Sequence, residues 1–154
     1  MAAPTQTLTL RTEQDTNRFA AQMAKVLMAG DTLLLSGHIG AGKSAFARAL
    51  IRHVAGSEIE VPSPTFTLVQ TYDLPGAEIW HCDLYRLTHP DDLYELGIED
   101  AYETAICLIE WPDRLGETAP PGALSLEFAA KETHHLVSLQ TDDQWAKRLS
   151  GIHV

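Results

Sequence analysis

The sequence predicts an α/β fold in which helices flank a mixed β-sheet, and three observations lead to this prediction. Strand-like segments alternate with amphipathic helices in the N-terminal part of the chain. Residues 31–36 read DTLLLS, a nearly continuous apolar run that is typical of a buried strand. Later strand-like segments follow one another across short turns, which predicts antiparallel hairpins in the middle and C-terminal parts. Because no linker, repeat or low-complexity segment interrupts the chain, residues 1–154 are expected to form a single domain.

Local patterns define the expected elements in order from the N-terminus. Polar and apolar residues alternate over 5–10, which predicts a strand, and Thr12 then caps a helix that ends at Gly30. A second helix is expected over 43–56, because its apolar residues recur at helical spacing. The remaining expected elements are strands over 65–73, 77–87, 105–111, 124–131 and 134–141, a short helix and a helical turn over 90–102, a turn-rich segment over 112–123, and an Asp-capped helix over 142–149.

Charge and cysteine usage narrow the classes of function. The chain has 11 Lys and Arg against 21 Asp and Glu, a net charge of −10, so its average field repels a phosphate backbone. Direct, stable nucleic-acid binding is therefore not expected. Cys82 and Cys107 each lie inside an apolar run, which indicates buried thiols in a reducing compartment. The N-terminus has no signal-peptide pattern and no apolar run approaches a membrane span, so we expect a soluble, cytoplasmic protein without a membrane partner.

The segment GHIGAGKS, residues 37–44, is the strongest functional signal. Its glycines allow the backbone to turn its amide groups toward an anion at a helix N-terminus, and an apolar strand precedes it as this motif requires. Lys43 would reach the β- and γ-phosphates, and the Ser44 hydroxyl would help to hold Mg²⁺. The fold is therefore expected to be that of a P-loop NTPase. The expected nucleotide-binding residues are Gly37, His38, Ile39, Gly40, Ala41, Gly42, Lys43, Ser44 and Ala45.

Two carboxylates follow buried strands and are candidates for the metal and for catalysis. Asp83 ends the run IWHCD, where a P-loop protein places its metal-linked carboxylate, and Glu110 ends the run ICLIE. Asp83 is therefore expected to hold Mg²⁺, with Ser44 and Glu110 as further candidate ligands, and Glu110 is expected to be catalytic. In the alternative interpretation, the carboxylates cap backbone amides or pair with Arg86 or Arg114.

The nucleotide is expected to be ATP rather than GTP. Residues 73–76 read DLPG and match a GTPase motif, but Pro followed by Gly is typical of a hairpin turn. The guanine-reading motif N-K-x-D needs an asparagine after the P-loop, and the single asparagine of this chain is Asn17. The sequence does not locate the base pocket.

Two further segments have less specific patterns. Residues 61–69, VPSPTFTLV, contain two prolines that restrict the backbone and would present Ser63, Thr65 or Thr67 in a fixed loop. This loop is either a switch that senses the γ-phosphate or a rigid surface loop, and its spacing does not decide between the two. His134 and His135 are adjacent in an expected strand and would point to opposite faces, so they are not expected to share a metal.

Several segments together resemble the TsaE (YjeE) family of bacterial P-loop ATPases. They occur in the order and spacing of that family and span roughly residues 33–115. Each of the shorter segments is a weak signal alone, and their combination with the P-loop is specific. The matching segments are SGHIGAGKSAFARAL, VPSPTFTLVQTY, HCDLYRL followed by ELGIED, and IEWPDRL.

The resemblance implies a role in making N6-threonylcarbamoyladenosine (t6A) in tRNA. It implies that the chain is not the transferase but binds the TsaB–TsaD pair, and that its Mg²⁺-dependent ATPase activity, slow alone and stimulated by these partners, supports repeated turnover. Ser44 stands where the family commonly has Thr, and either residue supplies the hydroxyl for Mg²⁺. By position, the resemblance assigns phosphate and Mg²⁺ contacts to Gly40, Gly42, Lys43 and Ser44, the switch hydroxyl to Thr65, the metal-linked carboxylate to Asp83, and the catalytic carboxylate to Glu110 with Trp111 beside it.

Two other functions share parts of this pattern. A small-molecule kinase usually closes an arginine-bearing lid over the phosphates, and the arginines after the P-loop are scattered with no lid-like insertion. A nucleotide-gated adaptor, in which hydrolysis is incidental, would use the same phosphate-binding loop. The sequence therefore leaves the adaptor open.

Overall fold

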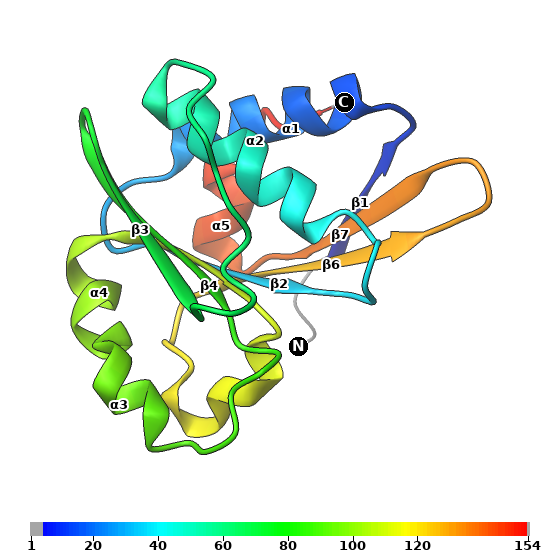
Figure 1. Ribbon diagram of the computed structural model, residues 1–154. Coiled ribbons are helices and arrows are strands. Elements are labelled where there is room, and N and C mark those ends of the chain that lie inside the picture. The colour runs from blue at the N-terminus through cyan, green and yellow to red at the C-terminus, as the bar shows by residue number, and fades with distance from the viewer. Residues whose placement is uncertain (1–4, 154) are drawn as a thin grey trace.

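Seven strands form one mixed sheet in the computed structural model, which describes residues 5–153 (Figure 1). The strand order across the sheet is β1-β7-β6-β2-β5-β4-β3. The strands are β1 (Thr5–Leu10), β2 (Thr32–Ser36), β3 (Val69–Leu74), β4 (Ala77–Asp83), β5 (Ile106–Glu110), β6 (Leu124–Ala130) and β7 (His135–Gln140). The helices are α1 (Glu13–Val26), α2 (Lys43–Ala55), α3 (Asp92–Leu96), α4 (Ile98–Thr104), the 3₁₀ helix η1 (Pro112–Thr118) and α5 (Asp143–Arg148).

The middle of the sheet is parallel and its two sides are antiparallel. Strand β2 pairs in parallel with both β5 and β6, and β4 pairs in parallel with β5. The β3–β4 and β6–β7 pairs are antiparallel hairpins, and β1 joins β7 at the edge. The predicted mixed sheet with two hairpins is therefore confirmed. Because β2, β4 and β5 run in the same direction, their carboxyl ends meet at one edge of the sheet, where ligands bind in open α/β folds.

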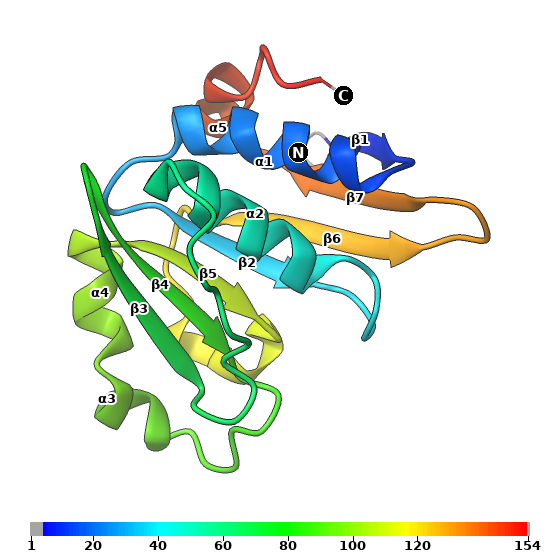
Figure 2. The ribbon, with the colours of Figure 1, turned by 45° about the horizontal axis from the view of Figure 1, so that its top comes forward.

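Helices cover both faces of the sheet (Figures 1 and 2). On one face, α1 and α2 pack over a core in which the Phe46 ring contacts the tilted rings of Phe19 and Phe128, with centroids 5.0 and 5.6 Å away. On the other face, α3, α4 and η1 cover a second core that contains Cys82 and Cys107, both buried and free as predicted. Packing against two layers explains why the central strands are apolar throughout rather than alternating.

The first helix is shorter than predicted. The helix α1 begins after the predicted cap, since Thr12 accepts a hydrogen bond from the Asp15 amide, but it ends at Val26 and not at Gly30. Leu27 is extended, and the Gly30 amide donates to the Ala105 carbonyl at 3.0 Å. The chain leaves the helix early because it must reach the start of β2 beside β5.

The predicted strand over 65–73 begins only at Val69. Leu68 has a φ of 70°, and its amide donates to the Pro64 carbonyl at 2.7 Å, which closes a turn instead of extending the strand. The predicted strand over 77–87 likewise ends at Asp83, and the Leu87 amide turns back to the Leu84 carbonyl. Both differences place irregular backbone at the carboxyl end of β4, where loops rather than strands carry binding residues.

The segments that follow β5 and end the chain match the predictions more closely. Strand β5 ends at Glu110, one residue earlier than expected, because Trp111 has a φ of 59° and redirects the chain. The predicted turn-rich segment over 112–123 contains η1, which Pro112 opens. The predicted Asp cap of the last helix is Asp142, whose side chain accepts a hydrogen bond from the Trp145 amide.

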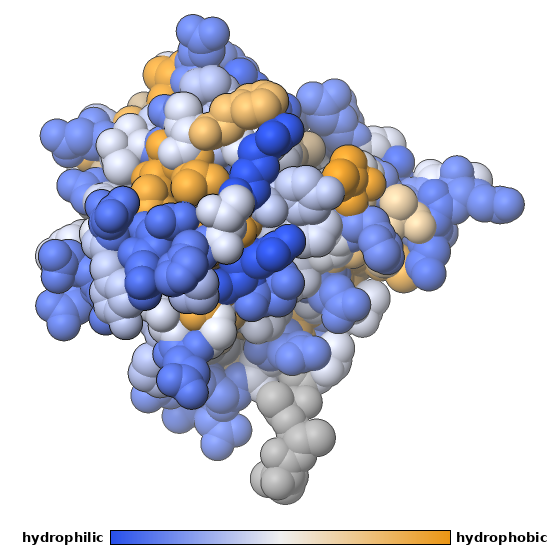
Figure 3. All heavy atoms as spheres, turned by 60° about the horizontal axis from the view of Figure 1, so that its bottom comes forward, coloured by the Kyte–Doolittle hydropathy of each residue, from blue (hydrophilic) through white to orange (hydrophobic). Residues whose placement is uncertain are grey.

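The surface of the molecule is mixed. On the face drawn in Figure 3, apolar side chains form small groups among hydrophilic ones. Among residues 5–153, no helix is long and apolar enough to cross a membrane.

Candidate functional site

The phosphate loop, residues 37–44, connects the carboxyl end of β2 to the first turn of α2. Gly37 and Gly42 have φ values of 137° and 110°, which residues with a Cβ rarely adopt. A Cβ on Gly37 would lie only 2.4 Å from the Phe128 carbonyl oxygen, and one on Gly42 would lie 3.2 Å from His135 Nδ1. Glycine is therefore required at both ends of the loop by conformation and by contact with β6 and β7.

The N-terminus of α2 is open to an anion. Its N-cap residue, Gly42, makes no side-chain capping hydrogen bond, and the first turn contains no acidic residue. The first amides of a helix lack intrahelical partners and lie at the positive end of the helix dipole. A negatively charged group would therefore be favoured at this end of α2.

Lys43 lies at the centre of the site. Its side chain is 5% exposed, its Nζ donates to the Gly37 carbonyl, and it lies 3.8 Å from the centroid of the Trp111 ring. Burial lowers the pKa of Lys43, while the nearby negative charges of Glu110, Asp83 and Asp113 oppose this shift. A phosphate beside Nζ would supply the hydrogen-bond acceptor and negative charge that this buried ammonium group favours.

The two predicted carboxylates are neighbours across the β4–β5 pair. Asp83 and Glu110 are register partners at the carboxyl ends of their strands and are 5% and 2% exposed. Glu110 Oε1 accepts a hydrogen bond from Ser44 Oγ at 3.0 Å, which joins β5 to the first turn of α2. Asp83 Oδ1 accepts from the Tyr85 amide at 3.0 Å. Buried carboxylates are retained when such hydrogen bonds offset their desolvation.

The loop before β3 also reaches this site. Thr65 Oγ1 donates to Asp83 Oδ2 at 3.0 Å and lies 2.7 Å from Ser63 Oγ. The turn at Leu68 fixes this approach, because the Leu68 carbonyl accepts from the Asp83 amide at 2.9 Å. Thr65 is thus the hydroxyl of this loop that touches a site carboxylate, whereas Thr67 is exposed and accepts a hydrogen bond from Gln70.

The donor set suits a hard cation that keeps most of its water. Ser44, Asp83 and Glu110 bring one hydroxyl and two carboxylates together, and Mg²⁺ is usually held by one or two carboxylates plus phosphate and water. Within residues 5–153, no group of three or more His, Cys, Asp and Glu side chains is arranged as a metal site.

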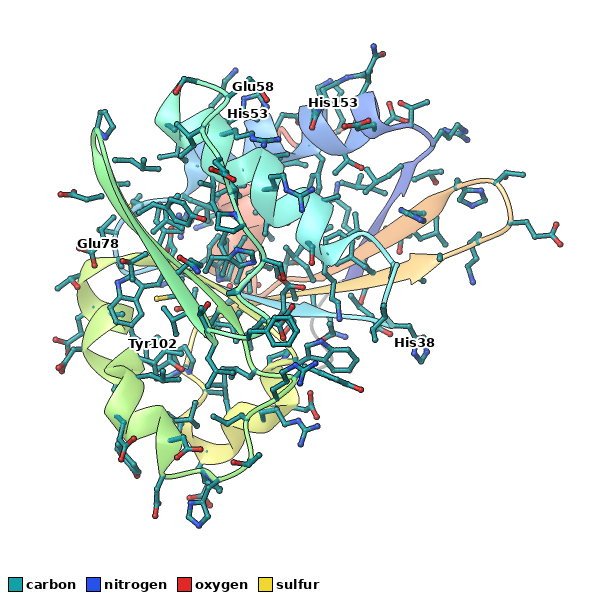
Figure 4. The ribbon with its side chains drawn as sticks, in the orientation of Figure 1. His38, His53, Glu58, Glu78, Tyr102 and His153 are labelled. Atoms are coloured by element: carbon teal, nitrogen blue, oxygen red, sulfur yellow. The ribbon has the colours of Figure 1, made fainter. Side chains whose placement is uncertain are left out.

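Other sequence-predicted residues occupy the margin of the site. His38 points outward from the tip of the loop (Figure 4), and Ile39 beside it is 78% exposed. Ala41 is buried, whereas Gly40 and Ala45 are exposed on either side of it along the loop and the first turn of α2. His38, Ile39 and Ala45 therefore offer backbone or rim contacts, not side chains directed at Lys43.

The two arginines that could have paired with the carboxylates, Arg86 and Arg114, lie elsewhere. The Arg86 guanidinium stacks over the exposed Phe66 ring at 4.4 Å, and Arg114 is exposed in η1. Trp111 instead contacts both Lys43 and Tyr85, with the Tyr85 and Trp111 ring centroids 4.9 Å apart.

Of the two adjacent histidines, His135 lies next to Gly42 of the phosphate loop. His134 precedes β7, and its ring contacts the Thr133 hydroxyl.

One residue of the site was missed by reasoning from the sequence. His81 is 2% exposed, and its Nε2 lies 2.8 Å from Glu110 Oε2. A histidine inside the apolar run IWHCD has the pattern of an ordinary core residue. The sequence signal that could have found it is its spacing: His81 is two residues before Asp83, so both side chains lie on the same face of the strand, toward the site.

A cavity of about 900 Å³ opens beside the phosphate loop. It is lined by Gly42, Ala45 and later residues of α2, by the start of α1, by residues 131–134 of the β6–β7 turn, and by His135 at the start of β7. Ligand pockets usually measure about 300–1,000 Å³, so the space is large enough for a nucleoside.

Comparison with known proteins agrees with this geometry. The family model described as "Threonylcarbamoyl adenosine biosynthesis protein TsaE" matches residues 10–138, which include the phosphate loop and both carboxylates. The chain belongs to the TsaE family. It is similar to the TsaE protein of Rickettsia bellii, with 41% identity over 72% of this chain and 77% of the relative. It is also similar to TsaE of Rickettsia prowazekii, with 34% identity over 94% of this chain and 92% of the relative.

A solved structure shares the overall fold of this chain. The crystal structure of YdiB from Bacillus subtilis aligns with a TM-score of 0.78 and covers 99% of this chain and 96% of the other. The two sequences are 20% identical, so this similarity concerns the fold alone. It confirms the predicted α/β architecture, in which helices flank a mixed sheet.

Proposed function

We propose that this chain binds ATP with Mg²⁺, hydrolyses it, and thereby supports t6A synthesis in tRNA by driving repeated turnover of a TsaB–TsaD transferase. The observation that carries the proposal is the convergence of Lys43, Ser44 and two buried carboxylates at the carboxyl ends of β2, β4 and β5. Membership of the TsaE family supports the pathway.

The residues present divide the work of hydrolysis among them. The amides of the loop and Lys43 would hold the phosphates, while Ser44 and Asp83 would hold Mg²⁺, which supplies charge neutralisation at the phosphates when bound. Glu110 would orient the attacking water, and Thr65 would report on the γ-phosphate through its contact with Asp83. Trp111 would cover the phosphates beside Lys43 and limit access of bulk water.

We further propose that the adenosine moiety of ATP enters the cavity beside Gly42. The cavity begins where the loop meets α2, so a nucleotide whose phosphates lie on the loop can extend into it. Ala45 is exposed at this junction, in the first turn of α2.

Ala45→Tyr tests the base site. The larger side chain should fill the entrance to the cavity and weaken ATP binding by about tenfold, equivalent to about 1.4 kcal/mol. Inorganic tripolyphosphate has no base, so its affinity should not change. Isothermal titration calorimetry with both ligands measures this contrast, and an equal loss for both would contradict the assignment of the cavity.

Asp83→Asn tests the metal role. Asparagine removes the negative charge and keeps one acceptor oxygen, which can serve either the Tyr85 amide or the Thr65 hydroxyl, while its NH2 group takes the other position. The Mg²⁺ concentration for half-maximal ATPase activity should rise about tenfold, since one charge-assisted contact is worth about 1.5 kcal/mol. A metal titration measures it, with the exposed Asp73→Asn as the matched control. If the Mg²⁺ concentration for half-maximal activity does not change, Asp83 does not hold the metal and serves only to fix the loop at Thr65.

The adaptor function differs from this proposal in a measurable way. An adaptor would support full transferase turnover with a non-hydrolysable ATP analogue, whereas an ATPase that drives a cycle would stop after one round. Counting modified tRNA per transferase with ATP, ADP and the analogue separates the two.

The net charge of −10 suits contact with a basic surface of a partner and leaves tRNA binding to the partner.

A further inference from the structure

His81 lies in the middle of β4 and points toward the phosphate-loop side of the sheet. Side chains alternate along a strand, so Ile79, His81 and Asp83 share one face. His81 is paired in register with Leu108, which places it diagonally opposite Glu110 on β5. A polar ring at such a position is 2% exposed and would be costly without a partner.

Glu110 is that partner, and the contact completes the surroundings of its carboxylate. His81 Nε2 lies 2.8 Å from Oε2, while Ser44 Oγ donates to Oε1 at 3.0 Å. The carboxylate is therefore held from two sides, by α2 and by β4. Two hydrogen bonds at different oxygens fix the rotation of a carboxylate as well as its place.

The geometry also indicates which ring nitrogen carries the proton. A carboxylate accepts hydrogen bonds, so Nε2 must donate to stabilise this contact. Among the described residues, His81 Nδ1 is buried and has no hydrogen-bond partner. A neutral ring with its proton on Nε2 satisfies Glu110, whereas a proton on Nδ1 would leave a buried donor unpaired.

We propose that His81 is a positioning residue for Glu110: its Nε2–H holds the carboxylate in the orientation that meets Ser44 and faces the phosphate loop. The inference rests on the proposed role of Glu110 in hydrolysis. Outer residues that orient a functional side chain typically change activity about 10- to 100-fold when they are removed. Among the described residues, the hydrogen bond of His81 leads to Glu110 and not to the phosphate loop or Lys43, so the loss of His81 should lower kcat with little change in KM.

The kinetic test uses His81→Leu, His81→Gln and the double variant His81→Leu/Glu110→Ala. His81→Leu should lower kcat about 10- to 100-fold with KM for ATP within about twofold, and His81→Gln, which keeps a donor near Nε2, should recover most of the rate. The double variant should be no slower than Glu110→Ala, because His81 acts through Glu110. Ile79→Val, a neighbouring buried change on the same face, should leave kcat unchanged.

A second readout does not depend on hydrolysis. Proton–nitrogen NMR of histidine-labelled protein should show His81 protonated on Nε2, with this signal shifted or broadened in Glu110→Ala. Protonation on Nδ1, an unchanged kcat in His81→Leu, or additive losses in the double variant would each overturn the proposal. If the unaltered chain does not hydrolyse ATP at all, the proposed function fails, and the NMR measurement alone decides whether His81 holds Glu110.

Discussion

Lys43→Ala should weaken ATP binding about 100-fold or more. The lysine is 5% exposed and already donates to the Gly37 carbonyl within the loop, so it is positioned before any ligand arrives. Two charge-assisted contacts to phosphate oxygens at about 1.5 kcal/mol each give an effect of this size. Alanine leaves the loop glycines and the N-terminus of α2 intact, and equilibrium titration with ATP measures the loss.

The control for this prediction is Lys147→Ala, which removes an exposed lysine from α5. Its ATP affinity should equal that of the unaltered chain, and the unfolding transition of both variants should stay cooperative. If Lys43→Ala binds ATP normally, the loop is not the phosphate site, and the proposed function would lose its foundation.

Glu110→Ala should lower the rate of ATP hydrolysis about 100-fold while ATP affinity changes little. The carboxylate is 2% exposed at the end of β5 and lies beside the hydroxyl of Ser44. A group at this position can orient water next to a phosphate held on the loop. Steady-state kinetics with separate measurement of ATP binding gives both quantities.

Removal of Glu110 also leaves Ser44 and His81 without an acceptor, so a second variant is needed. Glu110→Gln keeps an amide oxygen for one of these donors and removes the charge. It should be as slow as the alanine variant if the charge orients water. The exposed Glu117→Ala in η1 is the matched control and should be unaffected. A full rate in both Glu110 variants would make this residue purely structural.

Much of the fold followed from local patterns in the sequence. The caps at Thr12 and Asp142 and the glycines of the phosphate loop each have a local physical cause, and all were predicted. The DLPG segment also lies where predicted, with Pro75 and Gly76 between the paired residues that end β3 and begin β4. Patterns of this kind need no knowledge of distant contacts.

The parts that could not be predicted depend on contacts between distant segments. The loop at Thr65 has the apolar alternation of a strand, but the turn from Pro64 to Leu68 and the hydrogen bond from Thr65 to Asp83 hold residues 65–68 in another conformation. The partnership of His81 and Glu110 depends on the register of β4 against β5, which the chain sets through its whole core. The cavity beside Gly42 forms from three separate segments.

The most direct test of the central claim is the steady-state ATPase activity of the chain alone and with purified TsaB–TsaD, with modified tRNA per transferase counted in the same reaction. The partners should stimulate hydrolysis, and each transferase should form more than one product only when ATP is hydrolysed. Unchanged hydrolysis with the partners, together with the same product count when the chain is omitted, would contradict it.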